Sequence, residues 1–354
     1  MKITEKANEL IQTLMKRHPN TKLTIGIYHK GETDFKLFDI TGELPYESYL
    51  YEIGSIVKTF TTTLLAKYIN EGKMSLNDSV AKYIPELNDG NYYPTLKRLA
   101  THTASFSLMP PVIWDEVEWR DIWIGFESIY KKINKSPKAD YGDYYQRMTN
   151  SIQIDKQRLL QVIKKRKFED KDYPWKYSNV GFALLGLAIS NVANMPFSKI
   201  LTEQFREEFG INLLLSNKPH GNLVMGYDLK NREVGNKIIP ESACLTSAGE
   251  GILSTAEDMM KFAKMHLEDE DGYLQICHEV YGDKTFFPKY EQGLGWGVNI
   301  RDNIILHLGN TWGFASSLVV ATEKETAIIL LANVYVYREH IPLATEILLA
   351  NWEG

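Results

Sequence analysis

The chain has 354 residues, of which 44% are hydrophobic and 24% charged, with a net charge of −5. This length can bury a sizeable core in one large domain or two closely packed ones. The slightly acidic balance gives no reason to expect nucleic acid as a partner. Its two cysteines, Cys244 and Cys277, form neither a metal-ligand spacing nor a disulfide framework, so we expect no bound metal and no disulfide-stapled fold.

Neither a leader sequence nor a membrane span is recognisable. The first residues lead into a charged amphipathic stretch rather than an apolar leader. The longest apolar run, residues 180–189, is too short to cross a bilayer. We therefore expect a cytoplasmic protein from the chain as written, and an exported one if a signal was removed upstream.

Hydrophobic periodicity divides the chain into β-rich ends and a helical middle. A first helix is followed by two short strands around a Lys30-Gly31 turn. A second helix opens at Ser55 and ends before Gly72, and a capping box at residues 254–257 opens a third. Four short strands and a closing helix complete the pattern. The predicted helices cover residues 4–18, 55–70, 254–265 and 341–352, and the predicted strands 23–28, 35–38, 297–300, 303–308, 315–321 and 326–332.

Strands at both ends of the chain predict one sheet built from both termini, with a helical region inserted between them. The expected fold class is α/β (α+β), with a mainly antiparallel sheet flanked by helices. We predict an α/β sandwich domain from residues 1–75 and 245–354. Residues 76–244 are predicted to form a mainly helical domain with irregular loops and no clear series of strands.

Ser55 and Lys58 stand three residues apart at the predicted start of the second helix. Residues at this spacing lie on one helix face, so the amine can reach the hydroxyl. The amine accepts a proton only when neutral, which requires burial or a neighbouring cation. A serine at a helix N-terminus also has its backbone N–H where an oxyanion forms. The pair therefore predicts nucleophilic catalysis.

The same spacing occurs three times, at Ser55/Lys58, Ser79/Lys82 and Ser128/Lys131. Spacing alone does not separate them, and only a second proton carrier and a substrate clamp elsewhere in the chain can single out one pair.

Tyr177-Ser178-Asn179, which follows a Pro-Trp loop and precedes an apolar helix, is the best candidate for that second proton carrier. A phenol between cations can lose its proton and relay one from the serine to a leaving group. The amide of Asn179 can hold a substrate carbonyl. The alternative is structural, with Ser178 and Asn179 capping a helix beside a half-buried tyrosine.

His307-Leu308-Gly309-Asn310 ends an apolar strand and supplies a candidate clamp. A glycine near a strand end allows a ligand to approach the backbone, and the next N–H can complete an oxyanion hole. His307 can supply a positive charge or a hydrogen bond. The alternative is a structural histidine at a strand end.

Taken together and in this order, these motifs resemble those of the serine β-lactamase and penicillin-binding superfamily. The similarity is greatest to its class C β-lactamase-like branch, which includes DD-carboxypeptidases, D-aminopeptidases and esterases. It extends beyond the motifs. Further segments that resemble those of this superfamily are Tyr51 to Leu87, RLATHTAS at Arg98 to Ser105, Tyr177 to Ile189, SAGEGILSTAEDMMKF at Ser247 to Phe262, QGLGWG at Gln292 to Gly297, and Leu331-Ala332-Asn333.

The resemblance implies a serine hydrolase of the β-lactamase/transpeptidase-like fold that works through an acyl-enzyme. Ser55 would be the nucleophile, Lys58 and Tyr177 would share the general acid and base work, and the N–H groups of Ser55 and Asn310 would form the oxyanion hole. No metal or organic cofactor is implied, and the partner would be a small-molecule or short-peptide substrate. The substrate-binding residues implied are Asn179, His307, Gly309, Asn310 and Asn333.

One departure concerns the third motif, where the family usually has Lys-Thr-Gly or His-Thr-Gly and this chain has Leu308 in the threonine position. The threonine hydroxyl helps to hold a substrate carboxylate in the family. We therefore hypothesise weaker recognition of penicillins or of a peptide C-terminus, unless Thr311 or another group compensates.

Residues 106–172 are rich in aromatic and charged residues and are candidates for a substrate-side wall. The spacing of Ile122, Phe126 and Ile129 favours a packed helix face for those three. Tyr141, Tyr144 and Tyr145 are the better cleft candidates.

The leading functional hypothesis is a hydrolase acting on a small ester, amide, D-amino-acid peptide or β-lactam. The alternative is a penicillin-binding or sensor protein that is acylated but does not turn over. An assembly protein without catalysis fits less well, because no motif residue has been replaced by an inert one.

Overall fold

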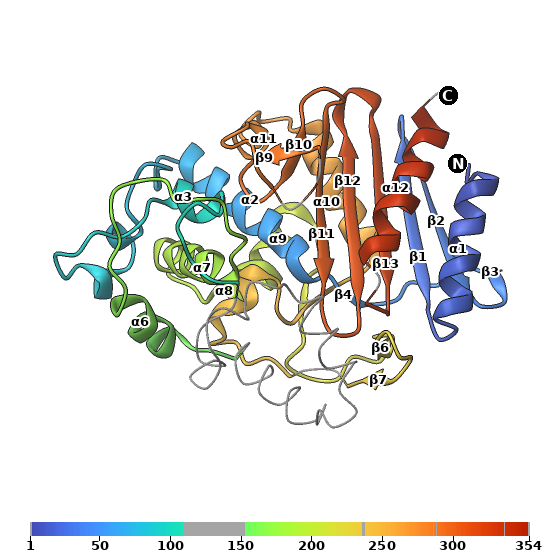
Figure 1. The fold of residues 1–354 in the computed structure, drawn as a ribbon, viewed down its shortest axis with the longest axis horizontal. Helices are drawn as coiled ribbons and strands as arrows, with labels where there is room; N and C mark the ends of the chain where they lie inside the picture. The colour runs from blue at the N-terminus through green and yellow to red at the C-terminus, as the bar shows by residue number, and fades with distance from the viewer. Residues whose placement is uncertain are drawn as a thin grey trace.

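The computed structural model describes residues 2–108, 153–235, 238–285, 287, 289–335 and 337–352. Its main sheet is antiparallel throughout and has the strand order β3-β2-β1-β13-β12-β11-β10-β9. Strands β1 and β13 pair along their full length, so the two chain ends meet in one sheet, as predicted (Figure 1). The strands are β1 (Leu23–His29), β2 (Glu32–Asp39), β3 (Gly42–Leu44), β9 (Glu291–Gln292), β10 (Gly297–Asn299), β11 (Ile304–Asn310), β12 (Ala315–Ala321) and β13 (Thr326–Ala332).

Both faces of this sheet are covered, which explains why its central strands read as continuous apolar runs. Helices α1 (Glu5–Arg17) and α12 (Tyr337–Trp352) cover the outer face, where both termini lie (Figure 1). Helix α10 (Ala256–Glu268) packs on the inner face. Alternate residues of β13 therefore belong to different cores: Ile328 and Leu330 to the outer cluster, Ile329 to the inner one.

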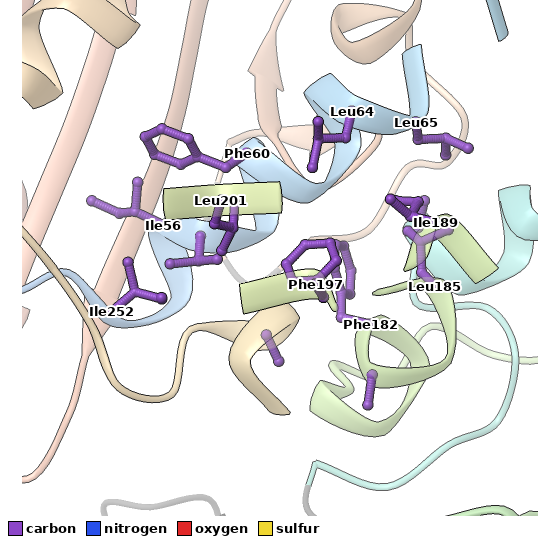
Figure 2. Packing of buried hydrophobic residues seen from close by; sticks show 14 of the residues in the cluster. Ile56, Phe60, Leu64, Leu65, Phe182, Leu185, Ile189, Phe197, Leu201 and Ile252 are labelled. Atoms are coloured by element: carbon purple, nitrogen blue, oxygen red, sulfur yellow. The ribbon is translucent and has the colours of Figure 1, made fainter. Parts of the chain in front are cut away.

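The half of the molecule that carries Ser55 is organised around α2 (Val57–Asn70), which is buried along nearly its whole length. Its threonines bond back to carbonyls one turn earlier, so their hydroxyls are satisfied inside the core. Figure 2 shows its apolar side chains packed against those of α7 (Asn179–Ala193). The remaining described helices are α3 (Leu96–Ala100), α6 (Lys156–Lys164), α8 (Phe197–Lys199), α9 (Phe205–Phe209) and α11 (Gln275–His278).

A second, three-stranded sheet joins the two halves. It contains β4 (Tyr51–Glu52), β8 (Ile252–Ser254) and β5 (Leu214–Leu215), in the order β4-β8-β5. Strands β6 (Gly226–Tyr227) and β7 (Glu233–Val234) form a separate hairpin. The expectation of no strand series in residues 76–244 is therefore corrected. Two-residue strands carry too little periodicity to be recognised from sequence.

Two predicted helix starts also need correction. Helix α10 is capped by Thr255, which accepts from the Asp258 N–H at 3.2 Å, so the capping box begins one residue later than predicted. Helix α12 begins at Tyr337, before Pro342, rather than at Ile341.

Within the described residues, no single helix combines the length and apolar character needed to cross a bilayer. Only Asn179–Ala193 and Phe197–Phe209 taken together meet that test, and an 80° bend separates them.

Candidate active site

Ser55 lies in a single 3₁₀ turn, Gly54–Ile56, rather than in the helix itself, because α2 begins at Val57. Ile53, the residue before this turn, is held by two hydrogen bonds. Its N–H donates to the Ile252 carbonyl at 3.1 Å, and its carbonyl accepts from the Ser316 hydroxyl at 2.7 Å. The turn is therefore tied to both sheets before the nucleophile is reached.

Three glycines allow the backbone to close around Ser55. Gly54 has a φ of +53° and Gly249 a φ of +120°, conformations that side chains disfavour. A Cβ on Gly54 would lie 2.8 Å from the Asn310 nitrogen, and one on Gly249 would lie 2.7 Å from the Ser55 nitrogen. A Cβ on Gly309 would lie 1.9 Å from the Ile53 carbonyl oxygen. The amide nitrogens of Ser55 and Asn310 are thus close neighbours, as an oxyanion hole requires.

Lys58 is completely buried one turn after Ser55. Its Nζ donates to Ser55 Oγ at 3.1 Å and to the Ala248 carbonyl at 2.6 Å. Burial lowers the pKa of this amine to about 7, with the negative charge of Glu250 acting in the opposite direction. The predicted burial is confirmed, and a substantial fraction of the amine is neutral near pH 7 and able to accept the serine proton.

Tyr177 is hydrogen-bonded to the same serine, and the Lys58 amine lies 4.8 Å from the centre of its ring. Burial raises the pKa of the phenol; the Ser55 hydrogen bond opposes this, and the charge of Glu250 adds to it. The prediction of a phenol depressed by surrounding cations is therefore wrong. Tyr177 is a neutral phenol in the resting site and is placed to pass a proton between serine, lysine and substrate.

His102 was not assigned a role from sequence, although it lies within the segment RLATHTAS that looked familial. Its ring packs against that of Tyr177 with 4.5 Å between centroids, and its Nδ1 accepts from the Ser178 N–H at 3.1 Å. Burial lowers its pKa well below the usual range, so it is neutral. His102 therefore orients the Tyr177 loop without adding charge.

Asn179 is the first residue of α7 and is buried, two residues after Tyr177. Its N–H donates to the Leu108 carbonyl at 3.0 Å. Ser178 is the helix cap, since its hydroxyl accepts from the Gly181 N–H at 2.9 Å and donates to the Ser107 carbonyl at 2.8 Å. Within this motif Ser178 therefore has the structural role, as the helix cap, and Tyr177 is the residue that contacts Ser55.

His307 lies on the inner face of β11, with 6.4 Å between its ring centroid and that of Tyr177. Burial lowers its pKa to about 3, and the nearby Lys58 adds to this effect. Its Nδ1 donates to the Leu308 carbonyl at 2.6 Å, which leaves Nε2 as an acceptor. His307 is therefore neutral in the site without substrate, and its Nε2 is available for a hydrogen bond.

Leu308 points away from the catalytic residues. It pairs with Ser317 of β12, whose hydroxyl is 3.0 Å from His340 Nδ1 on α12, and cross-strand partners project to the same face of a sheet. Leu308 accordingly belongs to the outer apolar cluster. The hypothesis that a leucine replaces a carboxylate-binding hydroxyl inside the site is corrected, because this position faces the α12 layer.

Asn310 and Thr311, at the end of β11, each carry a buried oxygen that lacks a hydrogen-bond partner among the described residues: Asn310 Oδ1 and Thr311 Oγ1. Buried polar atoms are rarely left unpaired. Asn310 pairs with Ala315, a member of the outer apolar cluster, so its side chain projects to the same face of the sheet as that of Leu308, and only its backbone N–H lies beside the Ser55 turn.

Asn333 is engaged elsewhere. Its Oδ1 accepts from the Lys22 N–H at 2.6 Å, and its Nδ2 donates to the carbonyls of Met225 and Asn20 at 2.6 and 3.4 Å. Both amide hydrogens are used, so the expectation that Asn333 borders the pocket is corrected. It ties β13 to the start of β1 and to the segment that leads into β6.

The other serine–lysine pairs do not form comparable sites. Ser79 caps a 3₁₀ turn and donates to the Tyr93 carbonyl, while exposed Lys82 bridges to Asp78. Ser128 and Lys131, together with the aromatic candidates Tyr141, Tyr144 and Tyr145 and the helix-face candidates Ile122, Phe126 and Ile129, lie outside the described residues. Across the described part of the chain, no group of three or more His, Cys, Asp or Glu side chains could hold a metal ion.

Two features define the β-lactamase/transpeptidase fold. One is an antiparallel sheet built from both ends of the chain, and the other is a turn between this sheet and the helical region that carries the nucleophilic serine. A class C β-lactamase from Rhodobacter sphaeroides has this fold, with a TM-score of 0.74, 20% identity, and coverage of 99% of this chain and 100% of that one. The sequence profile of the Beta-lactamase family matches residues 7–351. The chain belongs to the Beta-lactamase family and is a serine hydrolase of that family.

Two curated relatives show how far the similarity extends. A β-lactamase from Providencia stuartii is 25% identical over 376 residues, covering 94% of this chain and 87% of the relative. Protein flp from Staphylococcus aureus is 25% identical over 308 residues, covering 84% of this chain. The match spans 55% of flp, so this chain corresponds to about half of that protein.

Proposed function

We propose that the protein cleaves a small ester or amide through an acyl-enzyme at Ser55. The observation that supports this proposal is that the Ser55 hydroxyl is hydrogen-bonded to both Lys58 and Tyr177. Ser55 Oγ accepts from the buried amine of Lys58 at 3.1 Å and is also bonded to the phenol of Tyr177. A serine with two proton carriers in direct contact is an activated nucleophile.

In acylation, Ser55 Oγ attacks the carbonyl carbon as its proton passes to Lys58, directly or through Tyr177. The negative oxygen that develops lies beside the Ser55 and Asn310 N–H groups. As the bond to the leaving group breaks, that group takes the proton back from the same relay. In deacylation, water loses a proton to the relay, attacks the acyl carbon and releases Ser55 with its own proton restored.

The site also bears on the substrate class. Because His307 is neutral and Leu308 faces the outer layer, the third motif offers no cation or hydroxyl to a substrate carboxylate. His307, whose Nε2 is an acceptor, offers an uncharged hydrogen-bonding group instead. We therefore favour a neutral ester or amide, including a D-aminoacyl amide, over a penicillin or a peptide with a free C-terminus.

Intact mass spectrometry tests the proposal directly. Wild-type protein exposed to a fluorophosphonate should gain one adduct mass at Ser55, and it should hydrolyse a p-nitrophenyl ester. The Ser55→Ala variant should do neither. Ser79→Ala is the matched control, since its serine has the same spacing to a lysine but caps a turn, and it should remain active.

The time course then separates turnover from trapping. An ester-derived adduct that accumulates without release would favour the alternative of an acylated sensor. Unchanged hydrolysis by Ser55→Ala would refute the nucleophile assignment.

A further inference from the structure

Glu250 lies on the segment that contacts both the nucleophile and its base. Two residues earlier, the Ala248 carbonyl accepts from the Lys58 amine at 2.6 Å. One residue earlier, Gly249 packs against the peptide between Gly54 and Ser55. The Glu250 N–H bonds back to the Leu245 carbonyl at 3.2 Å, which closes the turn. The side chain is half-buried.

This segment is held firmly between α2 and α7. Ser247 Oγ donates to the Phe182 carbonyl at 2.8 Å, and the Ser247 carbonyl accepts from Thr61 Oγ1 at 2.7 Å. Gly186 of α7 packs so closely that a Cβ there would lie 2.4 Å from Ser247 Oγ. The backbone position of Glu250 relative to Lys58 is therefore set by packing, since this segment cannot slide between the two helices.

The groups that surround the Lys58 amine come from every element packed against it. Tyr177 precedes α7, His102 follows α3 and His307 lies on β11. All three are uncharged at neutral pH, because burial raises the pKa of the phenol and lowers that of both imidazoles. Among the described residues, Glu250 is the acid whose charge acts on both Lys58 and Tyr177.

We propose that Glu250 is a positioning residue whose carboxylate stabilises the ammonium formed when Lys58 takes the serine proton, and so sets the pH at which Ser55 becomes nucleophilic. The inference deepens the proposed function and rests on it. In the step concerned, the Ser55 O–H bond breaks, an N–H bond forms on Lys58 and the serine oxygen bonds to the acyl carbon. Glu250 gains and loses no proton.

The sign of the effect follows from the charge. A nearby carboxylate raises the pKa of an amine and of a phenol. Replacing Glu250 by the neutral, similarly shaped glutamine lowers both. The neutral amine then persists to lower pH, so the acidic limb of the acylation profile moves toward lower pH. A shift of about one unit corresponds to a tenfold change in the protonation ratio at a fixed pH.

The test is the second-order rate constant for labelling of Ser55 by a fluorophosphonate between pH 5 and 9. We expect the midpoint for Glu250→Gln to lie at least half a unit below that of wild type, and Glu250→Asp to restore it. Glu241→Gln, an exposed acid on the same segment, should leave the midpoint unchanged.

An unshifted midpoint in Glu250→Gln, whether or not the rate falls, would overturn the inference, because a merely structural role lowers the rate at every pH. If Glu250→Gln does not fold, Glu250→Ala removes the same charge, and an unshifted labelling midpoint in that variant would likewise overturn the inference. Failure of wild-type protein to label at Ser55 would instead refute the proposed function.

Discussion

Gly309→Ala is a substitution outside the catalytic residues for which the structure predicts a large effect. The new Cβ would lie 1.9 Å from the Ile53 carbonyl oxygen and 2.3 Å from Ser316 Oγ. Ordinary contact begins near 3.4 Å, so one backbone must retreat by about 1.5 Å. Because Ser316 already holds that carbonyl at 2.7 Å, the displaced segment is the one that positions Ser55.

A misplacement of about 1 Å can lower an enzymatic rate by about 100-fold. We therefore expect kcat/KM for a p-nitrophenyl ester, and the fluorophosphonate labelling rate, to fall by about 100-fold or more. Overpacking of this kind should also lower the free energy of unfolding by about 1–3 kcal/mol. Urea unfolding and the two rate assays on one preparation measure both effects.

Gly221→Ala is the control, because a Cβ at Gly221 meets nothing within 4 Å. It should retain the rate and the stability of wild type. A Gly309→Ala variant that labels at the wild-type rate would refute the argument that close backbone packing places the nucleophile.

Two further predictions concern the outer layer of the sheet. Leu308→Thr should lower the free energy of unfolding by about 1–3 kcal/mol, because it buries a hydroxyl among apolar side chains. It should leave the ratio of activities on acidic and neutral esters unchanged; a selective tenfold gain on the acidic ester would show that residue 308 faces substrate. His340 is fully buried, and burial lowers its pKa to about 3, so the unfolded chain takes up a proton near pH 6.5 that the folded protein refuses. The free energy of unfolding should therefore fall as pH drops below about 6.5. His340→Leu should reduce the slope of this free energy against pH by up to about 1.4 kcal/mol per pH unit, measured by urea unfolding at pH 7.5, 6 and 5. An unchanged slope would contradict this account.

The fold could be predicted well where hydrophobic periodicity is long. The seven-residue strands β1, β11, β12 and β13 and helices α1 and α2 were all recognisable, because each buries a continuous or alternating apolar pattern. Strands β4, β5 and β8 are only two or three residues long. Their pairing is decided by the packing of distant segments, so sequence could not reveal it.

The catalytic residues were predictable to a different degree. The spacing of Ser55 and Lys58 and the Tyr-Ser-Asn motif are local patterns that the chain displays directly. The electrostatics were not local. The pKa of Tyr177 is raised and His307 is neutral because both side chains are enclosed by segments from across the chain.

The sequence by itself determined which residues can do the chemistry: a serine, a lysine one turn later and a tyrosine far downstream. Only the tertiary structure decided how these residues are charged and which of the neighbouring residues take part. In the tertiary structure Leu308 faces the outer layer, Asn333 bonds to backbone groups, and the segment that carries Glu250 contacts the base through the Ala248 carbonyl. The physical reason is that direction and burial depend on contacts between distant segments, which no local pattern encodes.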